Sequence, residues 1–219
     1  MDKNVVSQHL QDLEGKFSRW GLDACLVAGR AEIETMMCSV GKEAVHPVSE
    51  IEPRQIDQGQ AFWLTLKRGD LHIACIAARF IHLTPMGFEC YWRELCAGKY
   101  PNQKCPVGSV SEDIQRALHG KIVYFGGVQV AKSEQGSISK LGAFIEYAKL
   151  ISMRMWSFDK IYTIINTEHR PLARVYRFGS IFEAAVRWTS PPPDGLSNDQ
   201  LYLVEGRSEF ENRLAPQPG

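Results

Sequence analysis

The hydrophobic positions near the start of the chain recur every three or four residues: Val6, Leu10, Leu13, Phe17 and Trp20. That spacing places them on one face of a helix, and the Gly21 that follows is a common helix end. A second pattern of the same kind consists of Ile33, Met36, Met37 and Val40. We therefore expect helices in residues 1–60.

Branched and aromatic residues become dense at Ala61, where the pattern changes to that of strands. The segments AFWLTLK, from Ala61, and LHIACIAARFIHL, from Leu71, are separated by Arg68-Gly69-Asp70. Two such runs around a short turn predict a β-hairpin.

The stretch 84–120 has a mixed pattern. A short helix is indicated by Phe88, Tyr91, Trp92 and Leu95. Ser111, with two acidic residues directly after it, is a typical N-cap of a further short helix, which Gly120 ends.

Strands and helices alternate from Lys121 onward. A strand, KIVYFGGVQVA, is followed by the polar loop KSEQGS and by a helix from Ser139 to about Trp156. The apolar face of this helix comprises Leu141, Phe144, Ile145, Ala148, Ile151 and Met155. The segment from Lys160 predicts a second strand.

The remaining segments predict a short helix and two strands. The helix, HRPLARVYRFG, has Pro171 in its first turn and Gly179 just past its end. IFEAAVRW predicts one strand with alternate residues on one side: Phe182, Ala184, Val186 and Trp188. DQLYLVEG predicts the last strand, and the final residues a loose tail.

This order of elements predicts an α/β (α+β) fold in which helices flank a mixed, mostly antiparallel central sheet. We expect one domain, 1–219, with N-terminal helices in 1–60, a core in 61–207 and a tail in 208–219. The stretch 84–120 is an insertion in this scheme.

Composition narrows the class of protein. The chain has 219 residues with 25 basic and 25 acidic side chains, so its formal net charge is zero. This balance excludes a strongly basic nucleic-acid binder and a disordered chain. No apolar stretch approaches the roughly 20 residues of a membrane span, and the N-terminus shows no signal core. We expect a cytoplasmic protein with no membrane or nucleic-acid partner, and leave a homodimer open.

The six cysteines are expected to be free, mostly buried thiols. They are Cys25, Cys38, Cys75, Cys90, Cys96 and Cys105. No CxxC pair occurs, and the gaps among the last three are too irregular for a standard zinc site. We expect no metal site.

The junction between the strand from Lys121 and the helix after it could bind an anion. Amides at a helix start are unpaired and carry partial positive charge. Gly136 lets a ligand approach the backbone, Lys132 and Lys140 add charge, and Gly126-Gly127 indicates a bulge or a close backbone contact. A Gly and Ser at such a junction can also serve turning and capping alone, so the residues leave both interpretations open.

The order of elements in this half of the chain resembles the GNAT superfamily of N-acyltransferases. That family has a valine-rich strand, an Arg/Gln-x-x-Gly-x-Gly/Ala loop and a Leu five residues after the first glycine. VQVAKSEQGSISKL is similar if Gly136 is that glycine and Leu141 the leucine. HRPLARVYRFGS supplies the later Ala, Tyr and Gly of the family pattern. The resemblance covers roughly 61–205.

The sequence departs from that pattern at several positions. Ser133 stands where Arg or Gln is usual, or else Gln135 takes that role in a shifted register, and Ile138 stands at the second glycine. His169 replaces an Asn seven residues before Tyr176, and Ser180 replaces a Phe.

The resemblance implies a site for acetyl-CoA or another acyl-CoA. Its pantetheine arm would bind along Val128 and Val130, and its pyrophosphate would bind the amides of Gly136, Ser137, Ile138 and Ser139, with His169 also at the cofactor. Tyr176 would be the general acid for the leaving thiolate. The base stays open among Glu89, Glu94, Tyr124 and a water.

The function implied is transfer of an acyl group from acyl-CoA to an amine of a small molecule or protein. The alternative is a catalytically degenerate protein of the same fold that binds acyl-CoA or a partner without turnover. A third possibility is an unrelated nucleotide binder that uses Asp159, 23 residues after Gly136, for a ribose.

Overall fold

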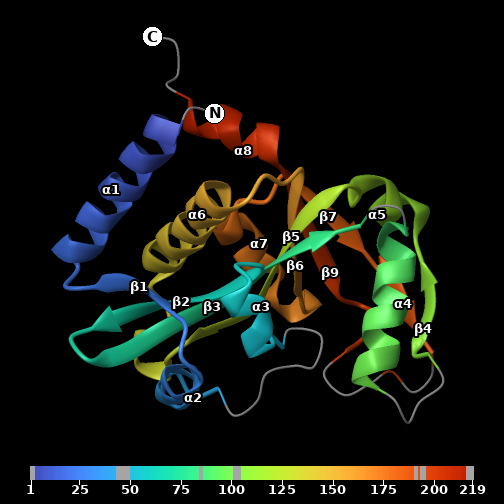
Figure 1. The fold of residues 1–219 in the computed structure, drawn as a ribbon, viewed down its shortest axis with the longest axis horizontal. Helices are drawn as coiled ribbons and strands as arrows, with labels where there is room; N and C mark the ends of the chain where they lie inside the picture. Colours follow the sequence, from blue (N-terminus) through green and yellow to red (C-terminus); the bar gives the residue numbers. More distant parts are fainter. Residues whose placement is uncertain are drawn as a thin grey trace. The chain divides into compact units, whose positions relative to one another are not determined.

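The computed structural model describes residues 3–42, 50–83, 86–100, 105–189, 192 and 196–215. The chain divides into two compact units. Unit 1 comprises 1–80 and 125–157, and unit 2 comprises 81–124 and 158–219. The strand order of the main sheet is β1-β2-β3-β5-β6-β9-β7 (Figure 1). Strand β5 (Lys121–Val130) contributes to both units, since the division falls between Tyr124 and Phe125.

Unit 1 contains the predicted hairpin together with a strand that the sequence pattern did not indicate. Strands β2 (Ala61–Arg68) and β3 (Leu71–His82) pair antiparallel around a turn at Gly69-Asp70. The additional strand, β1 (Asp23–Val27), pairs antiparallel with β2. Only the last of its five residues is buried, so β1 lacks the alternation that would have identified it.

Helices cover both faces of the unit 1 strands. Helix α1 (Lys3–Arg19) packs on α6 (Ile138–Met155), and Phe17 of α1 contacts the Tyr147 ring edge to face at 5.5 Å (Figure 1). Helix α2 (Arg30–Ser39) packs its Met36 in a separate cluster with Trp63 of β2. Because successive strand residues point to opposite faces, two covered faces explain why β2 is buried almost throughout.

Most of the helices predicted for unit 1 are confirmed. Helix α1 buries the expected face, and α6 begins within one residue of the expected start. Met155 is an exception on α6, because 39% of it is exposed. A short helix, α3 (Pro53–Asp57), lies in the expected helical region.

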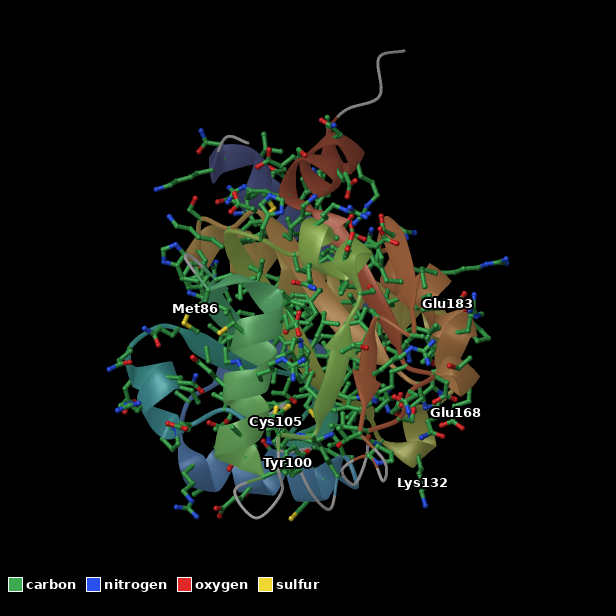
Figure 2. The ribbon with its side chains drawn as sticks, turned by 90° about the vertical axis from the view of Figure 1, so that its right-hand side faces the viewer. Met86, Tyr100, Cys105, Lys132, Glu168 and Glu183 are labelled. Carbon is green, nitrogen blue, oxygen red and sulfur yellow. The ribbon has the colours of Figure 1, made fainter. Side chains whose placement is uncertain are left out.

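Unit 2 is built around strand β9 (Leu201–Gly206), which pairs antiparallel with both β6 (Lys160–Ile165) and β7 (Ser180–Glu183). Helix α4 (Gly87–Lys99) lies in the stretch expected as an insertion, with Met86 and Tyr100 at its two ends (Figure 2). Its buried residues Phe88 and Trp92 lie one turn apart. Phe88 contacts the Tyr162 ring at 5.6 Å, and Trp92 contacts the Tyr202 ring at 6.4 Å.

The segment expected as one strand, 181–188, is instead two strands in two sheets. Strand β7 belongs to the main sheet, whereas β8 (Val186–Trp188) pairs antiparallel with β4 (Val107–Val110). The break lies at Ala184, whose φ is +46°. A left-handed residue interrupts the pleat, so a single strand does not continue across it. Strand β4 was not predicted.

The two short helices of unit 2 are confirmed, with one change at a helix end. Helix α5 (Glu112–Ala117) has the predicted N-cap, because the Ser111 hydroxyl accepts a bond from the Ile114 amide at 3.4 Å. Helix α7 (Arg170–Tyr176) ends at Arg177, whose φ is +52°, and not at a glycine.

The expected loose tail is wrong for residues 208–214, which belong to helix α8 (Arg207–Leu214). Phe210 and Leu214 are buried, and Arg213 pairs with the buried Glu205 of β9. Arg213 also donates to the Arg177 carbonyl at 2.9 Å, which ties α8 to the end of α7. The last four residues lie outside the described part of the chain.

The fold class predicted from the sequence is confirmed: a mixed, mostly antiparallel sheet with helices. The domain boundaries stay a prediction. All six cysteines are free thiols, but only Cys75 and Cys96 are buried, so the expectation of mostly buried thiols is wrong. Within the described ranges, no helix is both long and apolar enough to cross a membrane.

Two buried tyrosines provide a matched test of the packing. The Tyr202 hydroxyl is fully buried and bonds to nothing in the described part of the chain, whereas the Tyr147 hydroxyl donates to Glu14 at 2.7 Å. A buried hydroxyl without a partner costs about 1–3 kcal/mol. We expect Tyr202→Phe to be neutral or stabilising, and Tyr147→Phe to lower the free energy of unfolding by about 1 kcal/mol. Urea denaturation measures the free energy of unfolding of both variants. A larger decrease for Tyr202→Phe than for Tyr147→Phe would contradict the packing described.

Candidate cofactor site

The second half of β5 is more open than the first. Residues 122–126 are buried, whereas residues 127–130, which include Val128 and Val130, are half-buried. The change occurs at Gly127, which has a φ of +64°. A Cβ at Gly127 would lie 2.9 Å from Cη2 of Trp63 and 3.7 Å from Cβ of Ala77. The glycine therefore serves a close contact between the β5 backbone and the Trp63 ring.

The loop after β5 ends in an exposed glycine. Gly136 has a φ of +97°, and no atom lies within 4 Å of the Cβ position it lacks. L-residues with side chains rarely adopt such a φ, so Gly136 permits the sharp turn into α6. Among the described side chains, none outside the adjacent residues fills the space beside Gly136.

The start of α6 presents amides that the helix itself does not use. Ser137 is the N-cap, and its carbonyl accepts from the Lys140 and Leu141 amides, both at 3.1 Å. The helical amides before these two, those of Ile138 and Ser139, have no acceptor within the helix. The Ser137 side chain makes no capping bond. An 18-residue helix also carries a partial positive charge at this end.

A carboxylate next to this turn pairs with two cations. Glu134 ends the short helix η2 (Lys132–Glu134). Its two oxygens accept from the guanidinium of Arg68, one of them at 3.0 Å, and Oε2 lies 3.8 Å from Nζ of Lys140. The hydrogen bond from Arg68 lowers the pKa of the Glu134 carboxyl below its usual value. The three formal charges sum to +1.

The loop and the first turns of α6 also line a small apolar cavity of about 20 Å³, room for about one water. Val130, Glu134, Ser137 and Phe144 are among its lining residues. It is too small for a cofactor arm, so a large ligand would have to lie on the open surface of the turn.

Tyr176 lies in unit 2, at the end of α7. It is 5% exposed, and burial raises the pKa of its phenol to about 12. Ala173, one turn earlier, is also buried. The Tyr176 phenol therefore stays protonated over the whole physiological range.

Two basic residues at the start of α7 each lie next to an acidic side chain. His169 is exposed at the start of α7, and its Nε2 lies 3.5 Å from Oε1 of Glu168. Arg170 pairs with Glu183 of β7, and both Glu168 and Glu183 are marked in Figure 2. Arg177 lies just beyond the last residue of α7.

Two further candidates have structural roles. Oδ2 of Asp159 accepts from the Lys121 amide at 2.8 Å, so the residue expected at a ribose in the nucleotide-binder hypothesis links β5 to β6. Glu89, a candidate base, pairs with Arg93 of the same helix at 2.7 Å.

Of the residues predicted in unit 1, Val130 and Ser137 line the same cavity, while Val128, Gly136 and Ser139 lie close to them in the sequence. Ile138 is the first residue of α6 in the same turn. Sequence reasoning missed Arg68 and Glu134. They are 66 positions apart, and no local pattern connects a hairpin residue with a loop residue at that separation.

Comparisons with known proteins give the fold. Neither a family model nor a curated protein matches the sequence. Among solved structures, Arabidopsis thaliana NAA60 in complex with acetyl-CoA is 10% identical, with a TM-score of 0.50, covering 85% of this chain and 99% of that one. FeeM, an N-acyl amino acid synthase from uncultured soil microbes, is 11% identical, with a TM-score of 0.48, covering 87% and 93%. At this identity, the likeness to NAA60 shows a shared fold. The chain has the fold of the GNAT superfamily, as the sequence resemblance implied.

The two left-handed glycines give a matched test of the site geometry. Gly127→Ala would place a methyl group 2.9 Å from the Trp63 ring, whereas Gly136→Ala would meet nothing within 4 Å. Both substitutions add backbone strain of about 1–2 kcal/mol, and only the first adds a clash. We expect Gly127→Ala to lower the melting temperature clearly more than Gly136→Ala in thermal unfolding. Equal losses would contradict the close contact with Trp63.

Proposed function

We propose that the chain is an N-acyltransferase that moves an acyl group from acyl-CoA to an amine. The observation that carries this proposal is the open turn at Gly136. It places the free first amides of α6 directly after the half-buried end of β5 in a chain with the GNAT fold. NAA60 was solved with acetyl-CoA, which supports the same class of co-substrate here.

The residues present fit a phosphorylated thioester carrier in two ways. In the proposal, the arm forms hydrogen bonds along Val128 and Val130, at the half-buried end of β5. The amides of Gly136 to Ser139 are donors at the positive end of α6, a common seat for phosphate. In the proposal His169 also contacts the carrier.

The proposed reaction is nucleophilic substitution at the thioester carbon. The amine nitrogen forms the C–N bond, the C–S bond breaks, and the thiolate leaves with a proton. Tyr176 supplies that proton in the proposal, and its pKa of about 12 keeps it in the acid form. The amine loses a proton to water and a proton from water restores the Tyr176 phenol, so the net products are an amide and the free thiol. The acceptor is an amine of a small molecule or protein, and we place the enzyme in the cytoplasm, where its free thiols stay reduced.

Ligand binding is tested first and separately from turnover. A ligand that binds the folded state alone stabilises it, by about 2.7 kcal/mol at 100 times its Kd. We expect CoA and acetyl-CoA each to raise the melting temperature of the purified chain, while adenosine, which lacks the phosphates and the arm, does not. If neither CoA nor acetyl-CoA raises the melting temperature, the proposed function is contradicted.

Turnover is tested by the release of CoA in the presence of a panel of amines. We expect Tyr176→Phe to slow release by about 10²–10⁴-fold, the usual contribution of a general acid, with CoA binding unchanged. Because the pKa of Tyr176 is about 12, Tyr176 ionisation should cause no loss of rate below about pH 11. Tyr202→Phe, which removes a buried hydroxyl of the same unit, is the control.

The outcomes separate the proposal from its alternative. Unchanged release in Tyr176→Phe would remove the acid role of this residue. CoA binding with no release for any amine would favour the degenerate protein that binds acyl-CoA without turnover.

A further inference from the structure

Three charged residues from three elements of unit 1 meet beside the Gly136 turn. Arg68 is the last residue of β2, Glu134 is the last residue of η2, and Lys140 lies in the first turn of α6. We call this group the loop clamp. Its contacts are the two hydrogen bonds that Arg68 donates to the Glu134 carboxylate and the 3.8 Å distance from Nζ of Lys140 to Oε2 of the same carboxylate.

The loop clamp differs from an ordinary surface ion pair. The Glu134 side chain is only 12% exposed, although its partners Arg68 and Lys140 are 46% and 28% exposed. An arginine that meets both oxygens of a carboxylate fixes its orientation as well as its charge. Exposed pairs with one contact contribute little, but a shielded carboxylate with two cations from separate elements constrains all three.

A backbone hydrogen bond also links the loop to the hairpin strands. The Ala131 amide donates to the Ile73 carbonyl at 2.8 Å, at the start of the loop. From there to Ser137, Glu134 provides the link to the hairpin through Arg68 and to α6 through Lys140. Gly136, two residues after Glu134, has no neighbour that would hold a side chain there. The loop clamp is therefore the side-chain link from the turn to both the hairpin and α6.

We infer that Arg68 and Glu134 are positioning residues that hold the 132–139 turn in the shape that accepts the phosphate end of a ligand. This inference rests on the proposed function. The loop itself carries Ser133 where the resembling family has Arg or Gln, and a distant hairpin residue orders the loop instead. Donors that are fixed before binding do not lose conformational entropy when the ligand arrives, which favours affinity.

The experiment compares Arg68→Gln, Glu134→Gln and the double variant with Lys132→Gln. Lys132 is an exposed cation of the same loop that extends away from the ribbon (Figure 2) and pairs with no carboxylate in the described ranges. Lys132→Gln therefore removes the same charge as Arg68→Gln without touching the loop clamp. Melting curves establish that each variant is folded.

Two readouts are used. In the ligand-free protein, hydrogen exchange of amides 135–141 should be several-fold faster in both loop-clamp variants and unchanged in Lys132→Gln. By calorimetry, CoA should bind about tenfold more weakly to each loop-clamp variant, and the double variant should be no worse than either single variant. Pantetheine, which has no phosphate, should bind all variants equally.

Several results would overturn the inference. Unchanged exchange in Arg68→Gln and Glu134→Gln would show that the loop clamp orders nothing. Tighter CoA binding by Glu134→Gln would show that Glu134 only repels the phosphates, and an equal loss in Lys132→Gln would show an effect of net charge alone. If the unaltered protein binds neither CoA nor pantetheine, the proposed function fails, while the exchange result still decides whether the clamp orders the turn.

Discussion

The backbone conformation at the end of β5 is the constraint on which the site depends. Gly127 brings the strand against the Trp63 ring with a left-handed φ, and Gly136 turns the chain sharply into α6 with another. Between them, the last residues of the strand are only half-buried. A side chain at Gly127 would clash, whereas the space at Gly136 is open. The first glycine therefore serves packing, and the second leaves room for a ligand.

Packing on the unit 1 strands holds helix α6, which begins at this turn, in place. Helix α6 is fixed to α1 through the Phe17–Tyr147 contact and the hydrogen bond from Tyr147 to Glu14. Trp156, directly after α6, stacks on Phe62 with ring centroids 5.3 Å apart, and its Nε1 donates to the Gly59 carbonyl at 2.6 Å. Because α6 is fixed by packing at Tyr147 and after its end, the segment left for the loop clamp to order is the turn at 132–139, which includes the first amides of the helix.

The sequence predicted the elements whose pattern is strong and local. The hairpin and helices α1 and α6 follow from periodic apolar residues, and the Ser111 cap follows from its side chain. Strand β1 was missed because it buries one residue in five. Helix α8 was missed because its polar sequence carries only Phe210 and Leu214 as buried residues. The alternation at 181–188 suggested one strand because a left-handed Ala184 leaves no mark in a hydrophobic pattern.

The candidate site was predictable only where it is continuous in sequence. The strand, the glycine loop and the start of α6 follow each other directly, so an anion-binding site could be proposed from the residues. The pairing of Arg68 with Glu134 joins residues 66 positions apart and depends on the tertiary fold. The burial of Tyr176 could be anticipated from its helix face, but the size of its pKa shift required the surrounding structure.

The central claim is that a phosphorylated thioester carrier binds the turn between β5 and α6. Amide chemical shifts of the isotope-labelled protein, recorded while CoA is added, test it most directly. The account predicts that the largest shift changes fall on the amides of Gly136, Ser137, Ile138 and Ser139, with smaller changes along Val128 to Val130. Saturable changes confined to other residues, or no change at millimolar CoA, would contradict it.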